Sequence, residues 1–292
     1  MSSQITTAMI KSYGSNVIAL YQQADAKLRG KVMEEPMKSL THFFDRVEPT
    51  AAVKKTVRHG PTPIVETPHS RRSVNMVDYE WADLVDPQDE LRILIDPQSV
   101  YATNAVKALN RAYDDEVILA FTADAKTGVD GAGTATFASE AAGDEDFSAA
   151  ALTVQNLVTL KLKLDDQDVP EEGRYIIMAP AGFAQLLKQT TTPNVASVDY
   201  NTVKALVNGE IDSILGFQFI RSTRLPIPAA NMRYNFAWHR ESMAIAVGQA
   251  IKTNISERDD LSYAVQVYAA MTLGACRLQG KGVVRFKIDV TK

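Results

Sequence analysis

The side chains most often used for catalysis or metal binding are sparse in this sequence. It contains four histidines and one cysteine, namely His42, His59, His69, His239 and Cys276. No two histidines have the HExxH spacing of a zinc helix, and one cysteine cannot make a Cys/His zinc cluster. His239-Arg240-Glu241 matches half of the zinc deaminase signature, but the half with paired cysteines is missing. We expect no catalytic, cofactor or metal site. A metal-dependent hydrolase that uses His239 and neighbouring acids stays open as an alternative.

Two acidic clusters could do chemistry, and neither has the required spacing. Asp114, Asp115 and Glu116 are consecutive in a predicted helix, so their side chains point about 100° apart and cannot form one paired-carboxylate site. Solvated or interface charge is the better interpretation. The loop after Asp165 resembles a calcium loop at its start, but its sixth position is Pro170 instead of Gly, which excludes an EF-hand.

A basic set precedes these elements and comprises Lys54, Lys55, Arg58, Arg71 and Arg72. It could hold phosphate, but it lacks the interleaved aromatic residues that stack on single-stranded nucleic acid. Residues 1–72 contain 11 Lys/Arg and 6 Asp/Glu, whereas the whole chain has a net charge of −4. This asymmetry favours a basic arm that contacts another protein surface. A DNA-binding protein that works through the same residues stays open as an alternative.

We do not expect the segment that carries the basic residues to be a compact part of its own domain. Residues 45–75 contain four prolines, at positions 49, 61, 63 and 68, and only short alternating runs at Val53–Val57 and Ile64–Thr67. We predict a long two-stranded projection, which is barely stable alone and must be held by something outside its own fold. Apolar residues at helical spacing predict an amphipathic helix over 5–28, which also needs another surface.

The rest of the chain mixes helices and strands. Asp86-Pro87-Gln88 and Asp96-Pro97-Gln98 each supply an N-cap and a first-turn proline, so we predict a short helix to about residue 95 and a long one over 97–122. We further predict a surface hairpin or loop over 124–150, a helix from the Thr153 cap to Leu164, a buried strand over 174–179 and a helix from Pro180. Paired strands follow over 209–226 and further strands over 263–288, with short apolar elements at 203–207, 236–239 and 243–247. This order indicates the α+β class.

Composition sets broad limits on the class of protein. The hydrophobic content of 46% and the length of 292 residues fit one elaborated domain or two domains. The single Cys276 excludes an intrachain disulfide, and we expect it to be buried. No signal peptide or membrane span is recognisable, so we expect a soluble protein made in the cytoplasm.

Four segments together resemble a known family. They are ITTAMIKSYGSNVIALYQQADAKLRG near the start, VETPHSRRSVNMVDYEWADLVDPQDELRILIDPQSVYATNAVKALNRAYDDEVILAF, GRYIIMAPAGFAQLL followed by VNGEIDSILGFQFIRSTRLP, and SYAVQVYAAMTLGACRLQGKGVV. In this order they resemble the major capsid (coat) proteins of tailed bacteriophages, with the Hong Kong 97-type fold. The resemblance implies an N-terminal arm at 1–44, an extended β-hairpin loop at 45–78, a peripheral domain at 79–165 with a spine helix at 97–122, an axial domain at 166–256, and a return to the peripheral domain at 257–292.

The resemblance also implies a function and partners. The chain would assemble with itself into hexamers and pentamers of an icosahedral virion shell around double-stranded DNA, which it would contact weakly. Because only about 45 residues precede the extended loop, we expect a separate scaffolding protein, besides a portal protein and, as a further candidate, a cement or decoration protein. Assembly would occur in the bacterial host cytoplasm. The basic set would contact another subunit, with Asp114, Asp115 and Glu116 as candidate acidic partners. An encapsulin-like nanocompartment shell is the alternative within this fold.

Overall fold

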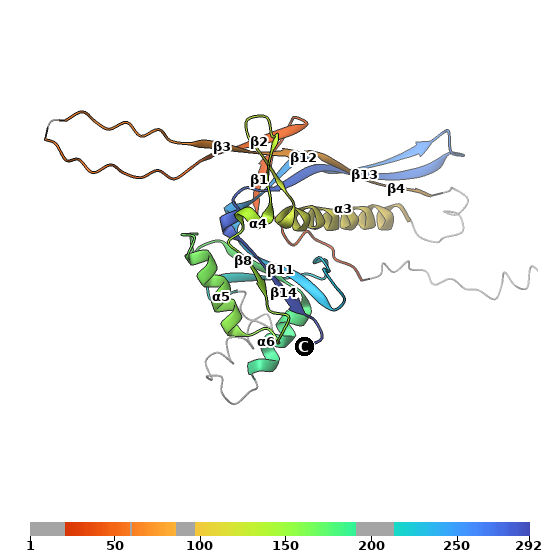
Figure 1. The fold of residues 1–292 in the computed structure, drawn as a ribbon. Coiled ribbons are helices and arrows are strands. Elements are labelled where there is room, and N and C mark those ends of the chain that lie inside the picture. The colour runs from red at the N-terminus through yellow and green to blue at the C-terminus, as the bar shows by residue number, and fades with distance from the viewer. Residues whose placement is uncertain (1–20, 59, 86–96, 191–212) are drawn as a thin grey trace, which may run out of the picture. The chain divides into compact units, whose positions relative to one another are not determined.

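The computed structural model describes residues 21–58, 60–85, 97–190 and 213–292 (Figure 1). The chain divides into two compact units. Unit 1 comprises Met1–Ala26, Asp78–Tyr113 and Gln249–Thr272, and unit 2 comprises Lys27–Val77, Asp114–Gly248 and Leu273–Lys292. The class is α+β, as the order of elements along the sequence predicts.

The described elements are short apart from one helix and two strands. The helices are α3 (Pro97–Thr122), α4 (Phe137–Glu140), α5 (Val154–Asp165) and α6 (Pro180–Thr190), with single 3-10 turns at Arg240–Ser242 and Gly280–Gly282. The strands are β1 (Met33–Pro36), β2 (Thr41–Val47), β3 (His69–Asn75), β4 (Val77–Val85), β5 (Ala125–Thr127), β6 (Gly133–Ala135), β7 (Gly143–Asp146), β8 (Arg174–Met178), β9 (Ser213–Ile214), β10 (Phe217–Arg221), β11 (Met232–His239), β12 (Met243–Arg258), β13 (Ala264–Arg277) and β14 (Val283–Asp289).

The long helix α3 has the predicted bounds of 97–122. Its buried side chains recur at every fourth position, at Ala105, Leu109, Tyr113, Val117 and Phe121. Residues four apart lie on the same face of an α-helix, so these five form one continuous stripe.

A six-stranded sheet forms the centre of unit 2, in the order β7-β14-β11-β8-β10-β9. Every residue of β8 is buried, which confirms the strand predicted over 174–179. On one face, leucines of α5 and α6 pack against β8 and β14 in a single apolar cluster. Helix α5 begins as predicted, because the Thr153 hydroxyl accepts a hydrogen bond from the Asn156 amide at 3.0 Å.

Aromatic residues cover the other face of this sheet. The Phe121 ring at the end of α3 stacks on Phe236 with centroids 4.6 Å apart and meets Trp238 edge-on at 5.0 Å. The buried Trp238 indole donates a hydrogen bond to the Lys31 carbonyl at 3.1 Å, which ties the incoming chain to β11. The end of α3 and the segment around Lys31 therefore belong to the core of unit 2.

A second sheet of unit 2 has the order β2-β3-β5-β6. Strands β2 and β3 pair antiparallel over their full length, from Thr41↔Asn75 to Val47↔His69. The connection between them, residues 48–68, is here called the flap, and Figure 1 shows its two arms running on as an open loop beyond β2 and β3. The predicted two-stranded projection is confirmed at this root. It does not extend along the arms, because the alternating runs Val53–Val57 and Ile64–Thr67 form no strand.

In unit 1, the outer parts of β12 and β13 lie beside β4, in the order β12-β13-β4. Buried residues alternate along β13: Val267, Ala269 and Met271 point inward, and Tyr268 and Thr272 are half-buried. The sheet thus has one apolar and one polar face, as expected of an antiparallel sheet that is covered on one side.

Four further predictions from the sequence are wrong, are met in part, or lie outside the described residues. The amphipathic helix predicted over 5–28 is wrong at 21–28, which has no helix, and its first part lies outside the described residues. The short helix predicted after Asp86 and the apolar element at 203–207 lie wholly outside them. The predicted surface hairpin over 124–150 contains the β5–β6 hairpin, followed by α4 and β7.

Candidate inter-subunit surfaces

The flap is exposed along its whole length. Every described residue of 48–68 is exposed except Gly60, which is half-buried. One backbone hydrogen bond closes its base, from the Glu48 amide to the Pro68 carbonyl at 3.0 Å. Between these two residues, the described part of the flap forms no intrachain hydrogen bond or ion pair. Beyond this one bond at its base, the described residues of the flap therefore leave their polar groups to solvent or to another molecule.

The local sequence explains why the two arms do not pair. Pro49, Pro61, Pro63 and Pro68 have no amide proton, so four positions cannot donate to a β-ladder. The arms expose apolar side chains instead: Val53 is 58% exposed, Val57 63% and Ile64 92%. Apolar residues this exposed on an unsupported loop indicate a contact that the single chain does not contain.

Three of the five basic residues assigned to this region lie on the flap itself. Lys54, Lys55 and Arg58 are exposed. Arg71 lies below them on β3, where its Nε donates to the Asp45 carboxylate at 2.5 Å and its guanidinium lies 5.8 Å from the centre of the Phe43 ring. Arg71 is thus already paired at the surface of the hairpin root.

Arg72 is a core residue, which corrects the expectation that it belongs to an exposed basic surface. It is only 1% exposed, and it forms an ion pair with Glu140 of α4. Its Nε also donates to the Leu278 carbonyl at 3.4 Å, and Arg46 Nη1 donates to the same oxygen at 2.5 Å. Arg71 and Arg72 are consecutive residues of β3, and successive residues of a strand face opposite sides of the sheet. Arg71 therefore points to solvent and Arg72 into the core.

Arg277 completes this buried cluster. Its side chain donates to the carbonyls of Phe121 and Ala123 at 2.9 Å each and of Ala135 at 3.1 Å. Its Nε lies 4.0 Å from Glu140 Oε2, and in the described structure these two buried atoms have no hydrogen-bond partner. Burial lowers the pKa of the Arg277 guanidinium, and the Glu140 carboxylate opposes this shift. The cluster joins the root of the flap to β13 and α4.

The three candidate acidic partners differ in accessibility. Asp114 is 2% exposed, and its carboxylate accepts the backbone amides of Lys27 and Leu28 at 3.0 Å each. Asp115 forms a bidentate ion pair with Arg224, which raises the pKa of that guanidinium. Glu116 is half-buried. Asp114 and Asp115 thus already have partners in their own chain, and a contact of these residues with another copy stays a prediction.

The two residues considered for catalysis, His239 and Cys276, are both buried. His239 is 8% exposed, and its Nδ1 accepts the Glu241 amide at 3.3 Å, so the His-x-Glu match is a turn at the end of β11. Cys276 is buried as predicted, and burial raises the pKa of its thiol to about 12. Within the described residues, no three His, Cys, Asp or Glu side chains gather to hold a metal ion. No described helix is long and apolar enough to cross a membrane.

Comparison with known proteins identifies the class. A family model described as phage capsid protein matches residues 5–290. No curated protein sequence matches the chain. The fold is similar to a capsid chain of the cyanophage P-SCSP1u, with a TM-score of 0.71 and 14% identity over 99% of this chain and 95% of that one. It is also similar to a capsid chain of the Helicobacter pylori bacteriophage KHP30, with a TM-score of 0.72 and 9% identity over 99% and 98% of the two chains.

Fold and family together define a shell subunit of a bacteriophage head. The chain belongs to the phage capsid protein family. It is a major capsid protein with the Hong Kong 97-like fold, it self-assembles, and its place is the virion. The matched family is a structural one, and the encapsulin-like alternative is not favoured.

Sequence reasoning missed two sets of residues. Glu140 and Arg277 carry no local signal, because their partner Arg72 is far from both along the chain. Asp78 and Glu80 on β4, considered below, alternate with the apolar residues Val77, Tyr79 and Trp81. This period of two could have indicated a strand with an acidic face.

Proposed function

We propose that the chain assembles into hexamers and pentamers that close an icosahedral shell around double-stranded DNA, and that the flap of each subunit lies on its neighbour. The supporting observation is the flap itself, whose apolar and basic side chains are exposed. Its described residues 49–58 and 60–67 make no hydrogen bond or ion pair within the chain. A loop of this length without contacts of its own gains stability only when a second surface covers it.

The proposed division of labour follows the domains that the family resemblance implies. That resemblance implies an arm at 1–44, an extended loop at 45–78, a peripheral domain at 79–165 and 257–292, and an axial domain at 166–256, at the ring centre. The sheet order β7-β14-β11-β8 joins strands of the first and last peripheral spans to strands of the axial span, so these parts fold together. Apolar flap residues supply binding energy, and Lys54, Lys55 and Arg58 set the register by charge. Many identical weak contacts make the closed shell stable.

The chain acts as a container and catalyses no reaction. Its net charge of −4 avoids the tight grip on phosphates that a strongly basic lining would produce. Scaffolding, portal and decoration proteins are proposed partners, and the shell assembles in the cytoplasm of a bacterial host.

The test is assembly of the expressed chain, alone and with a candidate scaffold, followed by electron microscopy. The informative variant combines Lys54→Glu, Lys55→Glu and Arg58→Glu, and its matched control reverses three exposed basic residues elsewhere, Lys38, Arg240 and Lys281. We expect the flap variant to remain as subunits or open fragments and the control to form closed shells. Closed shells from the flap variant at the wild-type yield would refute the role of the flap.

A further inference from the structure

The flap leaves the body from the small sheet β2-β3-β5-β6, here called the root sheet. In its described part the two arms of the flap form no strand, so the root sheet alone sets their direction. The first arm, residues 49–58, reaches at most about 33 Å from the root sheet when fully extended. A tilt of the root sheet by about 10° would move the end of that arm by about 6 Å, which exceeds the distance of ~4.8 Å between neighbouring strands. The orientation of the root sheet therefore decides where the flap lies on another molecule.

Charged side chains attach three strands of the root sheet to the rest of unit 2. On the edge strand β2, Arg46 donates to the Leu278 carbonyl at 2.5 Å. On the inner strand β3, Arg72 forms its ion pair with Glu140 of α4. On the other edge strand, β6, the Ala135 carbonyl accepts from Arg277 at 3.1 Å. These attachments include both edges of the root sheet and lie at different levels along its strands, so a swing or tilt of the sheet stretches at least one of them.

The remaining contacts of the root sheet are apolar and less directional. Its strands contribute Phe44 and Val74 to an apolar cluster with Met37, Cys276 and Leu278. Apolar burial stabilises in proportion to the area removed from water and has no preferred direction, so it tolerates small rotations. A hydrogen bond weakens steeply when it is bent. The charged attachments, and not the apolar cluster, therefore fix the angle of the root sheet.

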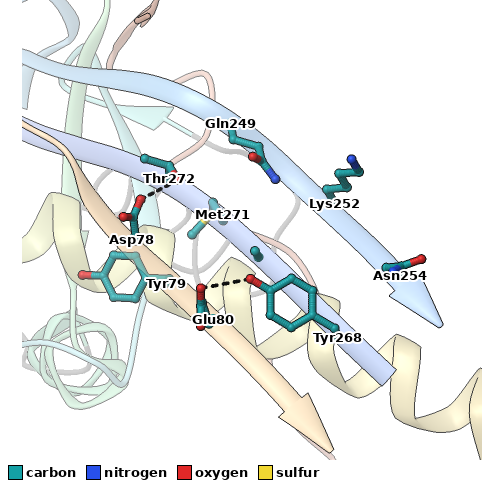
Figure 2. Close-up of a pocket in the computed structure, with 10 residues that line it drawn as sticks. Asp78, Tyr79, Glu80, Gln249, Lys252, Asn254, Tyr268, Met271 and Thr272 are labelled. Carbon is teal, nitrogen blue, oxygen red and sulfur yellow. Dashed lines mark hydrogen bonds between the residues drawn. The ribbon is translucent and has the colours of Figure 1, made fainter. Parts of the chain in front are cut away.

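Exposed hydrogen bonds in unit 1 show why burial matters for such a role. On the outer face of its sheet, a groove of about 460 Å³ is lined by side chains of β4, β12 and β13, among them Lys252 (Figure 2). At this groove Asp78 accepts from the Thr272 hydroxyl at 2.7 Å, and Glu80 accepts from the Tyr268 hydroxyl at 3.0 Å (Figure 2). Both carboxylates are exposed, so water can replace either donor at little cost.

The attachments of the root sheet are shielded from water instead. The side chains of Arg72 and Arg277 are 1% and 0% exposed, so water cannot replace a partner that either of them loses. Glu140 is their common neighbour, because its Oε1 accepts from Arg72 and its Oε2 lies 4.0 Å from Arg277 Nε. A Cβ at Gly280 would lie 2.3 Å from the Glu140 Cβ, so the turn at Gly280 packs directly on α4 and leaves it no room to shift.

We propose that Glu140 and Arg72 are positioning residues, which set the direction of the flap and, through it, the diameter of the closed shell. This role rests on the proposed function, in which the flap lies on a neighbour. Shells of different diameter need different angles between neighbouring subunits, so subunits whose flap has no single direction close into shells of mixed diameter. The role concerns specificity more than stability, because replacing a buried ion pair as a whole by uncharged side chains of similar size is often neutral for folding.

The variant that removes the pair as a whole is Arg72→Met with Glu140→Gln. Arg277 then loses one repulsion and one attraction, and it keeps its three backbone carbonyls. The urea unfolding midpoint of the unassembled subunit should therefore stay at the wild-type value. The matched control is Arg174→Met with Asp165→Asn, an ion pair whose side chains are 1% and 35% exposed and which lies on β8 and α5, outside the root sheet.

Distance measurement between spin labels tests the angle of the root sheet in unassembled subunits. The labels are attached at Val47→Cys, at the end of β2, and at Gln218→Cys on β10, because both residues are exposed and belong to unit 2. The native Cys276 is buried and stays unlabelled. The paired variant should broaden the distance distribution at least twofold, and the control should not. An unchanged width in the paired variant would overturn the positioning role, whatever its shells look like.

A second variant covers the case in which the paired variant does not fold. Arg72→Lys keeps the positive charge beside Glu140, but a single ammonium lacks the fork with which the guanidinium reaches both this carboxylate and the Leu278 carbonyl. It should also broaden the distance distribution, and a width equal to that of wild type would count against the positioning role in the same way.

Electron microscopy of assembled shells tests the consequence for diameter. In the paired variant, the share of closed particles at the main wild-type diameter should fall at least fivefold, and in the control it should stay the same. A paired variant with a lower unfolding midpoint, a lower yield and one shell diameter would show a merely structural role and overturn the proposal.

The charge-reversed flap variant described above separates this proposal from the function on which it rests. If that variant closes shells at the wild-type yield, the proposed function fails, and the positioning role fails with it. If that variant does not close shells while the Arg72/Glu140 variant gives the wild-type diameter alone, the proposed function stands and only the positioning role is overturned.

Discussion

Replacement of Glu140 by Gln should destabilise the subunit strongly, because this carboxylate faces two buried guanidinium groups. The side chains of Arg72 and Arg277 are 1% and 0% exposed, and that of Glu140 is 25% exposed. Loss of one partner of a buried ion pair costs about 3–5 kcal/mol, since the remaining charge stays buried without compensation. Water reaches part of Glu140, so we expect the lower end, about 3 kcal/mol, or roughly 100-fold in the unfolding equilibrium.

The assay is urea unfolding of unassembled subunits, followed by the fluorescence of the two tryptophans, of which Trp238 is fully buried. The matched control is Glu171→Gln, because Glu171 is 75% exposed and lies 3.5 Å from Lys161. An exposed pair of this kind contributes about 0.5 kcal/mol or less. If Glu140→Gln costs no more than the control, the buried cluster does not hold the hairpin root in place.

Three further measurements probe single residues. Burial raises the pKa of the Cys276 thiol to about 12, so DTNB at pH 8 should label the native subunit at least 100-fold more slowly than the urea-unfolded one; equal rates would show that the thiol is accessible. The Lys287 ammonium lowers the pKa of Asp146 from 3.8 to about 2, so the stability that this carboxylate contributes is complete above pH 4 and is lost as the pH falls through 2. The difference in unfolding free energy between wild type and Asp146→Asn should shrink over that interval, and a constant difference would contradict it. A Cβ at position 274 would lie 2.2 Å from the Asn75 carbonyl oxygen, so Gly274→Ala should cost about 1–3 kcal/mol in urea unfolding, and an unchanged midpoint would contradict the close approach.

Local sequence signals predicted the regular elements well. Pro97 and Pro180 stand at the first positions of α3 and α6, and Thr153 caps α5, because helix starts depend on a few adjacent residues. The continuous apolar run of β8 likewise indicated a strand that is covered on both faces.

Contacts between distant residues could not be predicted in this way. Arg71 and Arg72 are adjacent and identical in type, yet one is exposed and the other buried beside Glu140. Which of the two arginines is buried depends on the face of β3 that α4 covers, and this is not visible in the local sequence. Likewise, Lys252 and Glu80 line one groove because β12 and β4 flank β13, an order that the sequence does not reveal.

The open flap has a consequence for how shells correct errors. If the flap docks on a neighbour as proposed, fixing the backbone of roughly 20 residues costs on the order of 20 kcal/mol, and this cost opposes what the docked arms gain. A subunit that joins a growing edge in the wrong place would then be held weakly and could leave again. Proofreading of this kind needs no dedicated enzyme, since only subunits with all their neighbours in place are retained.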